Sequence, residues 1–272
     1  MLSVNEHSCP YRDGQTLIEL AKKFQPDADI FIINGFPTSA DVTVKDGDTI
    51  SLICRGKQPT KAEIDSLLSA RHTPGIQKVI KQSTIAILGL GGLGSAVAGA
   101  MAKIGIGKML LSDYDVVEPS NLNRQHYFVD QIGMPKTRAL HDNLLRMNPS
   151  VSLELVEKQL VADDLPVYFG KVDVLIECFD DPAMKAVALR SILGTMKKVA
   201  YVGSSGMAGF GSNNTIRTQT IHPGIYLVGD GVSGAQPGQG LMAPRVGIAA
   251  HHQANQTLRI ILGEVERRAD IE

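Results

Sequence analysis

Apolar residues from residue 84 onward alternate between strand-like and helix-like patterns. Thr84–Leu88 is a continuous apolar run, which is typical of a strand buried on both faces of a parallel sheet. A glycine turn follows, and the apolar residues between 96 and 104 then recur at helical spacing. The same alternation predicts further strands at Lys108–Ser112, Val172–Phe179 and Val199–Gly203, and a helix from about Pro135. Repeated βα units of this kind predict an α/β fold with a doubly wound, mostly parallel sheet.

The last part of the chain changes character. Residues 203–240 are rich in glycine, so we expect a long loop over one end of the sheet. A final helix is expected at about 245–262, ending at Gly263, because glycine is the usual residue just past a helix end.

The first 57 residues show a different pattern. One helix is expected at Thr16–Phe24, and short strands are expected at Leu2–Val4, Ile30–Ile33 and Thr49–Ile53. These elements predict a small α+β module. Thr60 with Glu63 has the form of a capping box, and Pro74 can start another helix. We therefore predict three parts: a small domain at 1–57, a helical connector at 58–83 and a large domain at 84–272.

Composition narrows the function classes. The chain has 272 residues, 43% of them hydrophobic and 20% charged, with a formal net charge of −1, so no global field favours nucleic acid or an anionic membrane. No apolar run is long enough to span a bilayer, and the N-terminus lacks a signal-peptide pattern. The three cysteines form no CxxC pair, which favours a reduced, cytoplasmic setting: Cys9, Cys54 and Cys178.

A glycine motif follows the first strand of the large domain. Gly89, Gly91, Gly92 and Gly94 sit between a buried strand and a helix, which is the context that gives a GxGxxG pattern meaning. Such a turn brings a helix N-terminus to a phosphate group, although a turn serving packing alone is the alternative. Asp113 ends the second strand, where a carboxylate accepts hydrogen bonds from ribose hydroxyls. Up to this point NAD and ATP fit equally well.

Charged residues near the same edge distinguish the two nucleotides. Arg124 follows the second strand and Lys136 precedes the next helix, a pairing suited to a triphosphate that loses pyrophosphate. Two solvated surface charges are the alternative. Asp180 and Asp181 follow the strand Val172–Phe179, where a carboxylate suits Mg²⁺ but equally suits a helix cap before a proline.

Five motifs in order resemble the ThiF/MoeB superfamily, which includes the ubiquitin-activating enzymes. They are GLGGLG, the SDYD around Asp113, SNLNRQ, GMPK and the ECFDD around Asp180. Two further stretches, GSSGMAGFGSNN and GLMAPRVGIAAHHQAN, resemble ThiF-type proteins of thiamine synthesis that carry a ThiS-like module at the front. Residues 1–57 accordingly resemble a ubiquitin-like β-grasp fold.

The resemblance implies a reaction and a partner. A carrier protein's C-terminal glycine carboxylate would attack the α-phosphate of ATP, with Mg²⁺ bound, and the carrier would be a ThiS-type sulfur carrier ending in Gly-Gly. A homodimer is also implied. Arg71 resembles the arginine that such enzymes send into the partner subunit's site, with a surface role as the alternative.

The same resemblance assigns roles to residues. Asp113 and Asn121 would hold the ribose, Arg124 and Lys136 would stabilise the phosphates, and Asp180 would hold Mg²⁺. The full nucleotide-binding set implied is Gly89, Gly91, Gly92, Gly94, Asp113, Ser120, Asn121, Leu122, Asn123, Arg124, Gln125, Lys136, Asp180 and Asp181.

Three features depart from the family pattern. The front module continues through Arg55-Gly56-Lys57 and has no free Gly-Gly end, so we expect a docking or regulatory element, or a relic. The two CxxC pairs that bind zinc in many relatives are missing, so no zinc is expected. Residues 203–240 contain no cysteine, which predicts adenylation without covalent transfer of the carrier to the enzyme.

Three other functions are alternatives to carrier adenylation. The same fold could act on another acyl substrate, such as a carboxylate on a modified tRNA base. A weakly active scaffold that captures carrier domains is a second alternative, although a scaffold needs none of Arg124, Lys136 and Asp180. A dehydrogenase fits least well.

Overall fold

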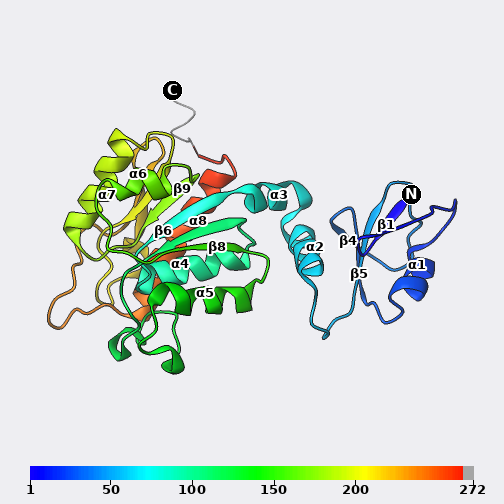
Figure 1. Ribbon diagram of the computed structural model, residues 1–272, viewed down its shortest axis with the longest axis horizontal. Helices are drawn as coiled ribbons and strands as arrows, with labels where there is room; N and C mark the ends of the chain where they lie inside the picture. The colour runs from blue at the N-terminus through cyan, green and yellow to red at the C-terminus, as the bar shows by residue number, and fades with distance from the viewer. Residues whose placement is uncertain (266–272) are drawn as a thin grey trace. The chain divides into compact units, whose positions relative to one another are not determined.

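The computed structural model describes residues 1–265, which form two compact units. The first unit is Met1–Val79 and the second begins at Ile80. Figure 1 shows the elements of each unit along the chain. The division into 1–57, 58–83 and 84–272 stays a prediction, but the first connector helix groups with the small unit.

The small unit contains one mixed sheet. Its strands β1 and β5 are parallel neighbours, and the other pairs are antiparallel, in the order β2-β1-β5-β3-β4. The strands are β1 (Leu2–Val4), β2 (His7–Cys9), β3 (Ile30–Ile33), β4 (Phe36–Thr38) and β5 (Thr49–Ile53). The expected small module is thereby confirmed as β-grasp-like, with β2 and β4 as strands that the sequence patterns did not predict.

Helices cover both faces of this sheet. The helix α1 (Leu17–Phe24) is capped by Thr16 and buries Leu17 and Leu20 against Ile50 and Leu52 of β5. Ser51 points to the opposite face because side chains alternate along a strand. There its hydroxyl bonds that of Ser66 at 2.8 Å, in the helix α2 (Lys61–His72). The capping box of Thr60 and Glu63 forms at the start of α2 as expected.

A hydrogen-bonded turn follows the last strand of the small sheet. The Arg55 N–H donates to Asp29 Oδ1 at 2.7 Å, and Lys57 Nζ donates to Asp27 Oδ2 at 3.0 Å. Gly56 lies between them with a φ of +83°, a conformation that glycine adopts at little cost. The chain then continues into α2 and α3 (Pro74–Gln82).

The large unit is built on a seven-stranded sheet with the order β11-β12-β10-β9-β6-β7-β8. Its strands are β6 (Thr84–Leu88), β7 (Lys108–Ser112), β8 (Ser152–Val156), β9 (Val174–Glu177), β10 (Ala200–Ser204), β11 (Arg217–His222) and β12 (Ile225–Gly229). Every described pair is parallel except β11 with β12. The chain adds β7 and β8 on one side of β6 and then crosses to add β9 on the other side.

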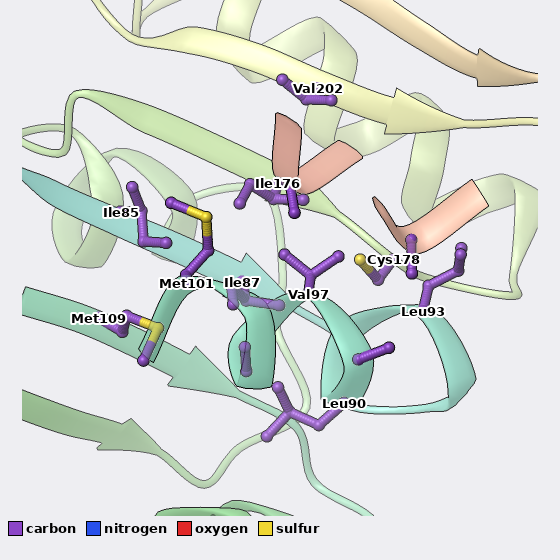
Figure 2. Packing of buried hydrophobic residues seen from close by; sticks show 14 of the residues in the cluster. Ile85, Ile87, Leu90, Leu93, Val97, Met101, Met109, Ile176, Cys178 and Val202 are labelled. Atoms are coloured by element: carbon purple, nitrogen blue, oxygen red, sulfur yellow. The ribbon is translucent and has the colours of Figure 1, made fainter. Parts of the chain in front are cut away.

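Two apolar cores cover the two faces of this sheet. Ile85 and Ile87 of β6 face one core, while Ala86 and Leu88 face the other. The first core includes α4 (Gly92–Lys103), α5 (Lys136–Met147) and α8 (Ala243–Ile261), and the second includes α6 (Asp164–Phe169) and α7 (Pro182–Gly194). Figure 2 shows side chains of α4 packed against those of the strands. The predicted doubly wound α/β fold is confirmed.

The expectation of one long loop over residues 203–240 is wrong in part. Strands β11 and β12 lie inside this stretch and form an antiparallel hairpin at the edge of the sheet. Buried Ile225, Tyr226 and Val228 supply the apolar run of β12, while β11 is almost wholly exposed and polar. These two strands were not predicted because the sequence on either side of the hairpin is rich in glycine.

Among residues 1–265, no helix combines the length and the apolar character needed to cross a membrane.

Replacing Phe169 with alanine tests the second core. The Phe169 side chain is 0% exposed, so its removal leaves a cavity and should lower the free energy of unfolding by about 3–5 kcal/mol. Val167 on the same helix is 78% exposed, so Val167→Ala is the matched control and should change stability little. Urea unfolding of both variants measures this difference, and similar losses would contradict the packing described.

Candidate functional site

The glycine turn lies where the strand order reverses. Ligands of open α/β sheets bind beyond the carboxyl ends of the strands at such a switch point, here between β6 and β9. Gly89 has a φ of +86°, and a Cβ there would lie 2.9 Å from the carbonyl oxygen of Cys178. The turn after β6 is therefore pressed against the end of β9.

The turn also brings the start of α4 close to the strand. A Cβ on Gly94 would lie 1.9 Å from the Gly89 carbonyl oxygen, so only glycine permits this approach. Gly91 precedes the helix and supplies no side-chain cap, so the first N–H groups of α4 are open to an anionic ligand.

Asp113 holds the turn from the neighbouring strand end. Its Oδ2 accepts from the Leu90 N–H at 2.7 Å, and its Oδ1 accepts from the Asp115 N–H at 2.9 Å. Burial raises the pKa of Asp113, and the positive charge of Lys136 opposes that shift. Each carboxylate oxygen keeps a second lone pair, so Asp113 can still accept from a ribose hydroxyl.

Arg124 lies directly against the glycine turn. A Cβ on Gly92 would meet the Arg124 Cγ at 3.2 Å, so the arginine stem covers this glycine. The guanidinium donates to Asn123 Oδ1 at 2.8 Å and to the Ser120 carbonyl at 3.4 Å. These contacts hold the charged group beside the start of α4.

The rest of this segment divides between packing and site. Asn121 is buried, and its Oδ1 accepts from the Glu118 N–H at 3.1 Å. The Leu122 side chain packs against the main core. Gln125 is 7% exposed, its Oε1 has no partner among the described residues, and its Nε2 would lie 3.7 Å from a Cβ on Gly91. A buried amide with an open acceptor beside the turn fits a bound ligand that donates a hydrogen bond.

Lys136 is buried and paired at the same edge. Its side chain is 8% exposed, and its Nζ bonds Asp115 Oδ2 at 2.8 Å. Because the Asp115 backbone is tied to Asp113 and Asp113 is tied to Leu90, the lysine belongs to the network around the glycine turn. The sequence predicted Lys136 here but not its carboxylate partner.

The two aspartates after β9 take different positions. Asp181 caps α7, with its Oδ1 accepting from the Ala183 N–H at 2.8 Å. Asp180 is exposed and directly follows Phe179, whose backbone nitrogen would lie 3.3 Å from a Cβ on Gly89. Asp181 is therefore a helix cap, while Asp180 is an exposed residue in the bend that follows β9.

The sequence patterns missed a buried ion pair beneath Asp180. Glu177 is 1% exposed, and its Oε1 accepts from Lys185 Nζ at 2.9 Å and from the Phe179 N–H at 2.7 Å. Burial raises the pKa of Glu177, while Lys185 and these hydrogen bonds oppose the rise. Lys185 also bonds Ser204 at the end of β10. Only the folded sheet brings Glu177, Lys185 and Ser204 together.

Tyr127 is a second residue that the motifs did not single out. Its hydroxyl donates to the Leu90 carbonyl at 2.8 Å, so it supports the turn from beneath. Burial raises the pKa of this hydroxyl most, and the negative charges of Asp113 and Asp115 raise it further. Tyr127 therefore stays a neutral hydrogen-bond donor.

Arg71 lies in the small unit. It lines a groove of about 440 Å³ between α2 and the sheet, together with Arg55 and Leu67. Its action at a partner subunit's nucleotide site stays a prediction.

The residues at the turn fit a nucleotide. Open helix N–H groups suit phosphate, Arg124 and Lys136 supply positive charge, and Gln125 offers an unused buried acceptor. Among residues 1–265, no cluster of three or more metal-binding side chains occurs.

Comparison with known families identifies the large unit. Residues 65–270 match the ThiF family, and residues 1–56 match the ThiS-like ubiquitin family. The chain belongs to the ThiF family. The resemblance drawn from the five motifs and from the front module is therefore confirmed.

Two bacterial relatives are similar over most of their length. The sulfur carrier protein ThiS adenylyltransferase of Escherichia coli K12 is 30% identical over 200 residues, covering 70% of this chain and 76% of that protein. The molybdopterin-synthase adenylyltransferase of the same strain is 30% identical over 195 residues, covering 69% and 76%. Ubiquitin-like modifier-activating enzyme 5 of Caenorhabditis elegans is 35% identical over 113 residues, which cover 38% of this chain and only 27% of that enzyme.

Solved structures agree on the fold. The Escherichia coli tRNA N6-threonylcarbamoyladenosine dehydratase, solved in complex with ATP, superposes with a TM-score of 0.68 at 19% identity, covering 76% of this chain and 98% of that one. Escherichia coli MccB, also solved with ATP, gives 0.58 at 20% identity, covering 78% and 66%. These superpositions show the same α/β architecture.

Substituting Gly94 tests the close approach at the turn. A methyl group in Gly94→Ala would collide with the Gly89 carbonyl, so we expect a loss of about 1–3 kcal/mol of stability. Gly99 on the same helix is the control, because a Cβ there meets nothing closer than 3.7 Å. Gly99→Ala should be neutral or more stable by about 0.5–1 kcal/mol. Equal unfolding midpoints in urea would contradict the described turn.

Proposed function

We propose that this protein is an ATP-dependent adenylyltransferase that activates the C-terminal glycine of a ThiS-type sulfur carrier in thiazole formation for thiamine. A carboxylate oxygen of the carrier attacks the α-phosphorus of ATP, the bond from that phosphorus to the bridging oxygen breaks, and pyrophosphate leaves. The product is a carrier acyl-adenylate. Membership of the ThiF family and the similarity to a ThiS adenylyltransferase support this reaction.

One observation supports the proposal: Arg124, Lys136 and Asp180 all belong to segments that border the glycine turn. The Arg124 stem lies on Gly92, Lys136 joins the network of Asp113 and Asp115, and Asp180 follows the strand end that touches Gly89. A hydride-transferring enzyme has little use for this set, whereas a displacement at phosphorus depends on it.

Each residue has a defined task in this proposal. Arg124 and Lys136 neutralise charge on the phosphates, and Asp180 would hold Mg²⁺, which would supply further positive charge for the leaving pyrophosphate. Asp113 and Asn121 bind the ribose. Because Asp115 and burial hold Lys136 in place before ATP arrives, little reorganisation is needed in the transition state. Loss of one such contact typically costs about 3 kcal/mol, or roughly 10²–10³ in rate.

The substrate assignment is tested by ATP–pyrophosphate exchange. We expect exchange with a ThiS-type carrier ending in Gly-Gly and none with the same carrier lacking its last two residues. A carrier of molybdopterin synthesis belongs in the same assay, because the molybdopterin-synthase adenylyltransferase matches this chain equally well. Faster exchange with the molybdopterin-synthesis carrier would make that carrier the assigned substrate. No exchange with any carrier would favour a binding scaffold.

Asp180→Asn tests the metal role. Removing the charge should lower the exchange rate by roughly 10²–10³ without changing the fold, because Asp180 is exposed. The matched control is Asp142→Asn on α5, whose side chain is 60% exposed. Exchange rates at saturating ATP over a Mg²⁺ titration measure the effect. An Asp180→Asn protein with the wild-type rate and Mg²⁺ dependence would remove Asp180 from this role.

A further inference from the structure

A buried arginine begins the last helix. Arg245 lies in the first turn of α8 with a side chain 5% exposed. Its Nη1 donates to the carbonyl oxygens of Gly211 and Ser212 at 2.8 and 2.9 Å. Its Nη2 donates to Thr215 Oγ1 at 3.0 Å and to Asp230 Oδ2 at 2.8 Å. One side chain thus binds two distant parts of the glycine-rich segment, defined here as residues 205–242.

Asp230 extends this anchor. Its Oδ1 accepts from the Val232 and Ser233 N–H groups at 2.9 and 2.8 Å, and its Oδ2 accepts from the Ser233 hydroxyl. A Cβ on Gly206 would lie 2.2 Å from Asp230 Oδ1, so the start of the segment also touches this carboxylate. Burial alone would raise the pKa of Asp230, but the hydrogen bonds from Ser233, Val232 and Arg245 hold it well below its usual value.

The same turn of α8 touches the nucleotide turn. Val246, the residue after Arg245, has its Cγ1 3.0 Å from where a Cβ on Gly92 would lie. Gly92 in turn packs under Arg124. Two successive residues of one helix therefore connect the glycine-rich segment with the start of α4.

The desolvation cost of the Arg245–Asp230 ion pair points to a role other than stabilising the fold. A buried ion pair must overcome the desolvation of both charges, and well-packed apolar residues are often at least as stable. The hairpin inside this segment is held in the sheet, since β12 pairs with β10. The loops on either side of it, residues 205–216 and 230–242, expose Phe210 and Val232 at 79% and 86%. The polar anchor joins these two loops to the start of α8 through Gly211 and Asp230.

We propose that Arg245, through Asp230, is a positioning residue that fixes the glycine-rich segment relative to the nucleotide turn and so sets the path of the acyl substrate's C-terminal tail. This inference rests on the proposed function, because an acceptor must reach the α-phosphate across the same edge of the sheet. Arg245 itself touches neither substrate. Its loss should therefore weaken acceptor binding while ATP binding is preserved.

Kinetics with substituted α8 arginines test the positioning role. For Arg245→Met we expect the KM for the ThiS-type carrier to rise about tenfold or more in ATP–pyrophosphate exchange, while the KM for ATP changes less than about twofold. Arg245→Lys, which keeps the charge, should recover part of the carrier affinity. Arg259→Met, an exposed arginine of the same helix, is the control. An unchanged carrier KM, or equal rises in both KM values, would overturn the proposal.

Limited proteolysis tests the anchor without catalysis. Chymotrypsin cleaves after exposed aromatic residues, and Phe210 lies in the segment while Phe128 lies elsewhere on the large unit, 52% exposed. Cleavage at Phe210 should accelerate about tenfold or more in Arg245→Met and in Asp230→Asn, with cleavage at Phe128 unchanged. Equal acceleration at both sites, or none at Phe210, would overturn the anchor. If the two variants show the expected cleavage but the wild-type protein shows no ATP–pyrophosphate exchange, the anchor stands and the proposed function is overturned.

Discussion

The close contact between the glycine turn and the end of β9 is the constraint on which the large unit depends. Gly94 must lack a side chain to approach the Gly89 carbonyl, and Gly89 must lack one to approach Cys178. These contacts set where the first turn of α4 begins and where Asp180 leaves the sheet. In the proposed function, the positions of the phosphates and of Mg²⁺ therefore depend on backbone geometry before any charged side chain contributes.

Charges around this centre fall into two groups. Lys136, Glu177 and Asp230 are buried or nearly so and paired at 2.8 to 2.9 Å with Asp115, Lys185 and Arg245. Arg124 and Asp180 lie nearer the surface. Because an unpaired buried charge is costly, the paired groups act chiefly as a framework, and the accessible ones remain free to meet a ligand. In the proposed function, Lys136 also neutralises phosphate charge, although it belongs to the buried, paired group.

Parts of this structure that depend on neighbouring residues in the chain could be predicted from the sequence. The glycine turn, the capping box at Thr60 and the buried strand Thr84–Leu88 follow from spacing and residue type alone. Exposed or polar elements were not predictable in this way: β11 has no apolar run, and β2 and β4 are three-residue strands that are mostly exposed. The ion-pair partners of Lys136 and Glu177 were not predicted either, because the folded sheet brings together residues that no sequence periodicity connects.

The strand β11 has a consequence for how copies of this protein can associate. An open sheet edge with free N–H and C=O groups invites a strand from another molecule. Here the outermost strand is largely polar and interrupted by an irregularity between Thr220 and His222, features that discourage such pairing. Growth of the sheet into a continuous intermolecular sheet is disfavoured on this side. A dimer formed on this side of the sheet would therefore join through helices or connecting segments instead of added strands.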